Sequence, residues 1–167
     1  MEVEYDNPTV KQLVVYEMDL GLNHAVRKSD DEVDINANLL LSVPGAPDGP
    51  GGVLICAQGS ITYKNWTRKD SKISLPQRKS AQTQQYIISH TFQKLSATAF
   101  FWLLQTESGD IFKLEITSKQ TLIASYFDSI APCRSLCFLS CGYMLAAAET
   151  GDHAMYQFAG IGDSETV

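Results

Sequence analysis

The sequence lacks the features of a membrane protein, a secreted protein and a helical protein. No apolar run approaches the roughly 18 residues that a membrane-spanning helix requires, so such a span is excluded. The first residues, MEVEYDNPTV, are acidic and lack the basic and apolar regions of a secretory signal, so we expect no export. No stretch of about ten residues places apolar side chains at helical spacing.

Metal-ligating residues are few and scattered. The four cysteines follow no disulfide-framework spacing, so we expect free thiols in a reducing compartment. Three of them recur every four residues, which is not the spacing of zinc or iron–sulfur motifs, and in a strand would place them on one face as small apolar side chains. We therefore predict no metal site among these residues: Cys56, Cys133, Cys137, Cys141, His24, His90 and His153.

Catalytic motifs are also missing. Asp152 and His153 lie near serines, but no nucleophile elbow of the form G-x-S-x-G occurs. Asp110 occupies the sister position of Asp152, and a turn-forming role explains both aspartates. The glycine-rich GAPDGPGG, residues 45–52, lacks the Lys-Ser/Thr of a phosphate loop. We expect no enzyme activity and no cofactor; a small propeller hydrolase or lectin using Asp152 and His153 is the alternative of a different class.

What the sequence does contain is typical of a globular all-β protein. Its hydrophobic content is 44% and its charged content 19% over 167 residues, enough for one domain with a sizeable core. Valine, isoleucine, tyrosine, phenylalanine and threonine cluster in short runs that are separated by glycine, proline, aspartate and serine. The predicted fold class is all-β.

Charge is distributed unevenly along the chain. The net charge of −6 argues against broad binding to a phosphate backbone, yet residues 64–80 carry six cations against Asp70 alone, which leaves −11 for the rest. This basic segment is a solvated loop, a docking surface for an acidic protein face, or a contact to an RNA backbone. A second surface candidate is the acidic SDDEVD, residues 29–34, which we expect to be a solvated inter-strand loop. The candidate interaction residues are Lys64, Arg68, Lys69, Lys72, Arg78 and Lys79.

Three glycines, Gly59, Gly109 and Gly151, mark a repeated hairpin. Each lies between two apolar runs, and the copies TESGDIFKLEI and AETGDHAMYQF align without gaps. In the first copy a turn one residue shorter shifts Ile61 and Tyr63 onto the equivalent apolar face. A further strand precedes each hairpin, as ANLLLSV, QYIISHTF and CRSLCFL, and a fourth follows two of them, as ISL and TLIASYF.

A four-strand unit that recurs every 42 to 50 residues is the signature of a β-propeller blade. Glycine at each turn supplies the positive φ that a tight hairpin needs, and AFFWLLQ is apolar on both faces, as between neighbouring blades. Because rings close with about four to eight blades, we predict an arc of about three four-stranded blades from a larger propeller. Its blades would lie around residues 12–80, 81–127 and 128–163, after a lead-in at 1–10 and before a tail at 164–167; QLVVYEM would be the trailing strand of an earlier copy.

Several longer stretches resemble a known family of large propeller proteins. They are YEMDLGLNHAVRK, VPGAPDGPGGVLIC, ITYKN, LLQTESGDIFKLEI, SYFDSIAP and AETGDHAMYQF. The family includes the large propeller subunits of splicing factor 3b, of the damaged-DNA-binding protein and of the cleavage and polyadenylation specificity factor. The DLGLNH and VPG-x-x-DGP signatures are similar to those of the splicing branch. The chain departs from the family pattern at LPQRKS, residues 75–80, where an arginine-rich IPRRR is usual.

The resemblance implies that the chain is a fragment of a larger multi-propeller protein, which acts as a non-enzymatic scaffold in the nucleus. It would belong to the splicing factor 3b complex of the U2 small nuclear ribonucleoprotein and support branch-site recognition in pre-mRNA splicing. Implied partners are the helical-repeat subunit, the small subunits and the spliceosomal ribonucleoprotein, without a membrane and with direct RNA contact left open. The alternative within the family is a ubiquitin-ligase adaptor or a factor in messenger RNA 3′-end processing.

Overall fold

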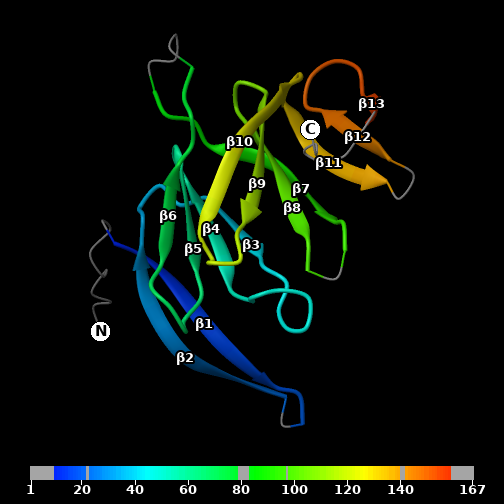
Figure 1. Cartoon of the computed structure of the whole chain (residues 1–167). Coiled ribbons are helices and arrows are strands. Elements are labelled where there is room, and N and C mark those ends of the chain that lie inside the picture. Colours follow the sequence, from blue (N-terminus) through cyan, green and yellow to red (C-terminus); the bar gives the residue numbers. More distant parts are fainter. Residues whose placement is uncertain (1–9, 22, 79–82, 97, 140–141, 159–167) are drawn as a thin grey trace. The chain divides into compact units, whose positions relative to one another are not determined.

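The computed structural model describes residues 10–21, 23–78, 83–96, 98–139 and 142–158. The predicted all-β class is confirmed: these residues form thirteen strands in four antiparallel sheets (Figure 1). Among them no helix has the length and apolar character that crossing a membrane would take. The chain divides into two compact units between Ala37 and Asn38.

The first unit is a hairpin of β1 (Lys11–Asp19) and β2 (His24–Val33). The expected strand QLVVYEM is found within β1. The expectation of a loop at residues 29–34 was wrong, because Ser29–Val33 belongs to β2 and pairs with Lys11–Val15. Aspartate and glutamate have low strand propensity, so the acidic sequence did not indicate a strand. Pairing with β1 stabilises the strand that forms there.

The second unit contains three sheets, each with its strands in chain order. The first sheet comprises β3 (Leu39–Ser42), β4 (Val53–Ala57), β5 (Ser60–Lys64) and β6 (Ser71–Ser74). The second comprises β7 (Ile87–Lys94), β8 (Phe100–Thr106), β9 (Asp110–Ile116) and β10 (Leu122–Ser129). The third comprises β11 (Cys133–Leu139), β12 (Tyr143–Ala148) and β13 (Ala154–Gln157). The proposed blade boundaries stay a prediction.

The three turn glycines have the backbone conformation that the repeat predicts. Their φ angles are +67° at Gly59, +87° at Gly109 and +96° at Gly151, in the left-handed region that a residue without a Cβ enters at little cost. The shift of register in the first copy is also confirmed. Ile61 and Tyr63 lie in the same buried cluster as Leu114.

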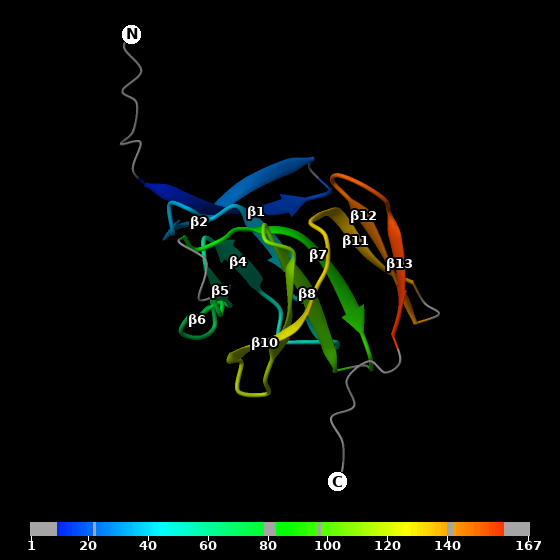
Figure 2. The same ribbon diagram turned by 90° about the horizontal axis from the view of Figure 1, so that it is seen from above.

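Strand β8 is buried on both faces, as the apolar run AFFWLLQ predicts. Trp102 and Leu104 pack into one core with residues of the first sheet, whereas Phe101 and Leu103 pack into a second core with residues of the third sheet. Figure 2 shows β7 and β8 between β4 and β5 on one side and β11 and β12 on the other. Because side chains alternate along a strand, one sheet contributes to two cores.

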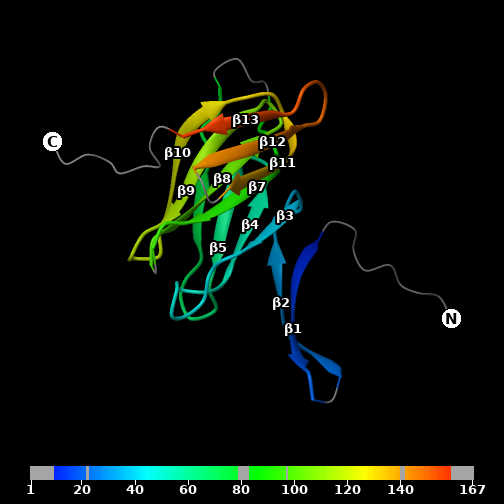
Figure 3. The same ribbon diagram turned by 90° about the vertical axis from the view of Figure 1, so that its right-hand side faces the viewer.

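The outer side of the third sheet has no such cover among the described residues. Leu145 of β12 is 42% exposed and Met155 of β13 is 63% exposed, whereas Met144 and Ala146 are buried in the core shared with the second sheet. Figure 3 shows β13 beside β12 at the edge of this sheet. The third sheet therefore pairs its strands like the second, but the residues that the structure describes cover only one of its faces.

Candidate interaction surface

The six candidate cations do not form one surface. Lys64 lies on β5 with its side chain only 15% exposed, and its ammonium pairs with Asp70 at 3.3 Å. Arg78 binds Asp110 of the neighbouring sheet. Lys79 lies outside the described residues. The remaining three, Arg68, Lys69 and Lys72, are exposed at the hairpin that joins β5 to β6.

A hydrogen-bonded turn shapes the end of this hairpin. The Arg68 amide donates to the Asn65 carbonyl at 2.8 Å, which places Trp66 and Thr67 at the two central positions. The Asn65 side-chain oxygen accepts from the Thr67 amide at 3.3 Å and from the Thr67 hydroxyl at 2.9 Å. Asparagine favours this geometry because its side chain bonds its own backbone two residues on.

The same asparagine ties the turn to the loop before β4. Its side-chain amide donates to the Pro50 carbonyl at 2.8 Å and to the Tyr63 hydroxyl at 3.1 Å. The Tyr63 hydroxyl in turn donates to the Gly51 carbonyl at 2.7 Å. The Asn-Trp-Thr sequence is therefore a structural turn whose asparagine amide is engaged within the protein.

The same hairpin carries an exposed aromatic residue in addition to the three cations. Trp66 is 50% exposed, while the other tryptophan, Trp102, is 2% exposed. Within the described part of the chain no acidic side chain pairs with Arg68 or Lys69. We call Trp66, Arg68, Lys69 and Lys72 the basic tip; Figures 1 and 3 show the β5–β6 turn at the end of the sheet opposite the β4–β5 turn.

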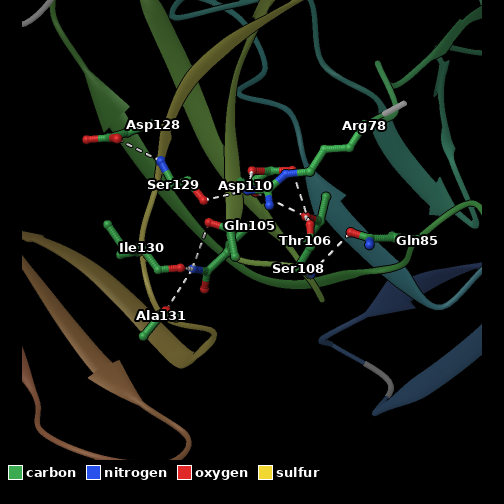
Figure 4. A network of polar contacts seen from close by, with 11 residues as sticks. Arg78, Gln85, Gln105, Thr106, Ser108, Asp110, Asp128, Ser129, Ile130 and Ala131 are labelled. Atoms are coloured by element: carbon green, nitrogen blue, oxygen red, sulfur yellow. Dashed lines mark hydrogen bonds and ion pairs between the residues drawn. The ribbon is translucent and has the colours of Figure 1, made fainter. Parts of the chain in front are cut away.

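Arg78 links the segment after β6 to the neighbouring sheet. Its Nε donates to one Asp110 carboxylate oxygen at 2.7 Å and its Nη2 donates to the other, while Nη2 also donates to the Ser129 hydroxyl at 2.8 Å (Figure 4). The Ser108 hydroxyl donates to the same carboxylate at 3.1 Å. The hydrogen bonds from Arg78 hold the pKa of Asp110 below its usual value, although burial opposes them. This network fastens the segment after β6 to β9 and β10.

A buried glutamine makes the corresponding link to the third sheet. Gln105 is fully buried at the end of β8, where its carbonyl oxygen accepts from the Cys133 amide at 2.8 Å and from the Ser89 hydroxyl at 3.1 Å. Its amide donates to the Ala131 carbonyl at 3.0 Å (Figure 4). Sequence reasoning missed this role; the available signal was one glutamine at the end of an otherwise apolar strand, which implies a satisfied buried amide.

The cysteines are separated by a β-bulge. Cys133 pairs with Ala148 and Ser135 with Ala147, so Arg134 is the extra residue of β11. The prediction that evenly spaced cysteines share a face was therefore wrong for this strand: Cys133 is buried and Cys137 is exposed, while Cys141 lies outside the described residues. Burial raises the pKa of the Cys56 thiol to about 12 and also raises the pKa of Cys133.

The remaining titratable candidates do not gather into a site. No group of three histidine, cysteine or acidic side chains within metal-binding reach occurs in the described residues. Asp152 and His153 are both exposed before β13. His90 lies on β7, where partial burial lowers its pKa. The polar groups described above therefore fall into two kinds: the hydrogen bonds of Arg78 and Gln105 between sheets, and the exposed residues of the basic tip.

Comparison with known proteins gives a consistent match over the chain. The family profile described as RSE1/DDB1/CPSF1 first beta-propeller matches residues 1–167. The pre-mRNA-splicing factor rse1 of Neurospora crassa is 43% identical over 171 residues, covering 92% of this chain and 14% of the relative. Splicing factor 3B subunit 3 of Drosophila melanogaster is 40% identical over 167 residues, covering 94% of this chain and 13% of the relative.

A plant protein matches to a similar degree. Spliceosome-associated protein 130 A of Arabidopsis thaliana is 40% identical over 163 residues, covering 94% of this chain and 13% of that protein. The chain thus spans about one seventh of the length of these curated relatives.

Proposed function

Since the chain belongs to the RSE1/DDB1/CPSF1 first β-propeller family, we propose that it is part of a non-enzymatic scaffold in pre-mRNA splicing. The observation that carries this proposal is the match to the splicing proteins of fungi, animals and plants at about 40% identity over more than nine tenths of the chain. The family profile alone does not separate the splicing branch from its sisters, whereas these relatives are named as splicing proteins.

The geometry supports a rigid framework that presents loops. Strand β8 shares its two faces between two cores, and Arg78 and Gln105 bind across from one sheet to the next. Close-packed protein interiors resist deformation, so the turns and loops at the ends of these sheets should keep fixed positions relative to one another. Binding residues lie disproportionately on loops held by such scaffolds.

The proposed setting is the splicing factor 3b complex of the U2 small nuclear ribonucleoprotein, in the nucleus. There the full protein would contact the helical-repeat subunit and the small subunits and so support recognition of the branch site. Residues 11–163 would supply an arc of its first propeller. The alternative is a sister role, as a ubiquitin-ligase adaptor or in 3′-end processing.

Affinity purification of the tagged parent protein from nuclear extract tests the proposal. Mass spectrometry should recover branch-site particle proteins, and recovery should persist after nuclease treatment, because the proposed contacts are between proteins. Recovery of a cullin or of polyadenylation factors instead would move the chain to a sister branch. Hydrolytic or sugar-binding activity that disappears in an Asp152→Ala, His153→Ala variant would contradict the scaffold.

A further inference from the structure

Strand β10 forms the outer edge of the second sheet. Within the described part of the chain it pairs with β9 alone, so one side of its backbone has no partner strand. It has eight residues, whereas β6 and β13, the corresponding edges of the other two sheets, have four each. Short edge strands are one means by which proteins prevent pairing with another chain, and a longer edge is a template for it.

The register of the β9–β10 hairpin shows which backbone groups of β10 point outwards. The Thr117 amide donates to the Thr121 carbonyl at 2.9 Å, and hydrogen-bonded pairs alternate with non-hydrogen-bonded pairs from there along the two strands. Leu122, Ala124 and Tyr126 therefore direct their N–H and C=O groups away from β9.

Only the middle of this edge is open to another strand. β6 lies beside the start of β10, where the Leu122 amide donates to the Ser71 hydroxyl at 3.4 Å (Figure 1). At the other end a β-bulge between Tyr126 and Asp128 interrupts the regular pairing. The outward-facing groups that remain for a partner are those of Ala124 and Tyr126.

An open pocket of about 400 Å³ adjoins this part of the edge. Its walls include Pro76 and Arg78, which follow β6, and Phe112 and Tyr126 of the second sheet. The rings of Phe112 and Tyr126 meet edge to face with their centroids 6.1 Å apart, and Tyr126 is 60% exposed. The volume lies within the range of pockets that bind small ligands, and the lining is largely apolar.

Arg78 gives one wall of this pocket a planar cation in a fixed orientation. Its Nε and Nη2 donate to the Asp110 carboxylate, and Nη2 also donates to the Ser129 hydroxyl (Figure 4). The pair of Arg78 and Asp110 carries no net charge with which to attract an acidic or a basic group. A fixed guanidinium plane and an aromatic ring instead favour a flat side chain, because such a side chain stacks on either of them.

From this arrangement we propose that β10 and the pocket together bind an extended segment of a partner protein that carries an aromatic side chain. The segment adds to the sheet as a fifth strand, and one of its residues exchanges two backbone hydrogen bonds with Tyr126. Residues opposite each other in a sheet have side chains on the same face, so this residue places its side chain beside the Tyr126 ring, in the pocket. The site goes beyond the proposed scaffold role and does not depend on it.

Other kinds of ligand would use one part of this site only. A helix satisfies its own backbone hydrogen bonds, so it would leave the outward groups of Ala124 and Tyr126 without partners. A small aromatic molecule would fill the pocket and make no strand. An extended segment with an aromatic side chain is the ligand that engages both the edge and the pocket.

The test ligand is a synthetic peptide with the central sequence Thr-Val-Trp-Val-Thr, flanked by lysines for solubility and labelled at one end. The β-branched residues favour an extended backbone, and tryptophan is enriched among the residues that dominate binding energy. On titration with the full 167-residue chain, the anisotropy of the label should rise to saturation with a Kd below about 1 mM.

Modified peptides separate the backbone contact from the side-chain contact. A methyl group on the tryptophan nitrogen removes the N–H that bonds the Tyr126 carbonyl and should weaken binding about 10-fold. A methyl group on the nitrogen of the following valine, which faces away from β10, should change the affinity less than about twofold. Replacement of the tryptophan by alanine should weaken binding about 10- to 100-fold, the range expected for an aromatic anchor.

Variants of the chain locate the site. Tyr126→Ala should weaken binding at least about 10-fold, whereas Tyr156→Ala removes a tyrosine of β13 that is 37% exposed and should leave the affinity unchanged. Ala124→Pro removes one outward N–H and no hydrogen bond to β9. Because proline is tolerated at such positions of edge strands, this variant should fold and bind about 2- to 10-fold more weakly. Circular dichroism checks the fold of each variant.

Three results would overturn the proposal. One is no binding of the peptide at millimolar concentration by a chain whose circular dichroism shows a folded β-protein. Another is equal weakening by the two N-methyl groups, or by Tyr126→Ala and Tyr156→Ala, which would mean that the peptide does not pair with β10. The third is a dimer of the chain alone that Ala124→Pro dissociates, which would make a second copy the occupant of this edge. Recovery of splicing proteins in the purification described above is independent of each result.

Discussion

The hairpins β8–β9 and β12–β13 have nearly the same turn sequence but different surroundings. TESGD and AETGD align at every position, and their glycines adopt similar φ angles of +87° and +96°. Yet Leu103 is fully buried, whereas Leu145, at the same distance before its glycine, is 42% exposed. Asp110 is buried and bound by Arg78, whereas its counterpart Asp152 is exposed.

The difference shows that a repeat determines the local shape of a strand pair. The neighbouring sheets determine how much that strand pair contributes to the free energy of unfolding. Sheet β7–β10 lies between two other sheets and contributes to two cores. Sheet β11–β13 shares one core, with its other face exposed among the described residues. Equivalent substitutions in the two hairpins should therefore have unequal effects, which gives each test an internal control.

The largest contrast is expected for the paired leucines. Leu103→Ala opens a cavity in the core between the second and third sheets and should lower the free energy of unfolding by about 3–4 kcal/mol. Leu145→Ala removes a side chain that is already partly in water, so it should cost about 1 kcal/mol or less. Urea unfolding of both variants measures the contrast. Equal costs would show that the outer face of β12 is covered in solution.

The turn glycines should differ for a steric reason. A Cβ at Gly109 would lie 2.1 Å from the Ile130 carbonyl oxygen, whereas a Cβ at Gly151 would meet nothing within 4 Å. Gly109→Ala therefore combines left-handed strain with a backbone clash and should cost about 2–3 kcal/mol, while Gly151→Ala should cost about 1 kcal/mol from strain alone. Thermal unfolding followed by circular dichroism ranks the two. A Gly109→Ala variant as stable as Gly151→Ala would mean that the β10–β11 connection moves aside freely.

The sequence predicted the parts of this fold that depend on local pattern. The repeated hairpins were identified from apolar runs, turn glycines and the register shift at Ile61 and Tyr63. These signals are reliable because alternating side chains favour apolar residues on one face of a strand and a positive φ favours glycine. Strand β2 escaped detection because it forms by pairing, and its acidic residues have little strand propensity of their own. The β-bulge at Arg134 was equally invisible, since any residue type can occupy it.

The candidate surface was predictable only in outline. Charge counting grouped residues 64–80 together, but in the structure the charges of Lys64 and Arg78 are paired with carboxylates of the protein itself. Those pairings depend on Asp70 across the hairpin and on Asp110, a residue 32 positions away, which a charge count does not bring together. Trp66 was not among the predicted surface residues, and its exposure became evident from the turn in which it lies.

The smallest contrast is expected for the paired aspartates and should depend on pH. Asp110→Asn loses a charge-assisted contact to Arg78 and should cost about 1.5–2 kcal/mol at neutral pH, whereas exposed Asp152→Asn should stay within about 0.5 kcal/mol. The Asp110 pKa is lowered in the folded state, so its contribution is complete above the unfolded pKa of about 3.9 and disappears as pH falls through the lowered folded value. The stability gap between the parent chain and Asp110→Asn should therefore be constant from about pH 5 to pH 8 and narrow below about pH 4. Urea unfolding across this range measures the gap. A gap that persists unchanged in acid would show that the link between the sheets depends on side-chain shape and not on the charge of Asp110.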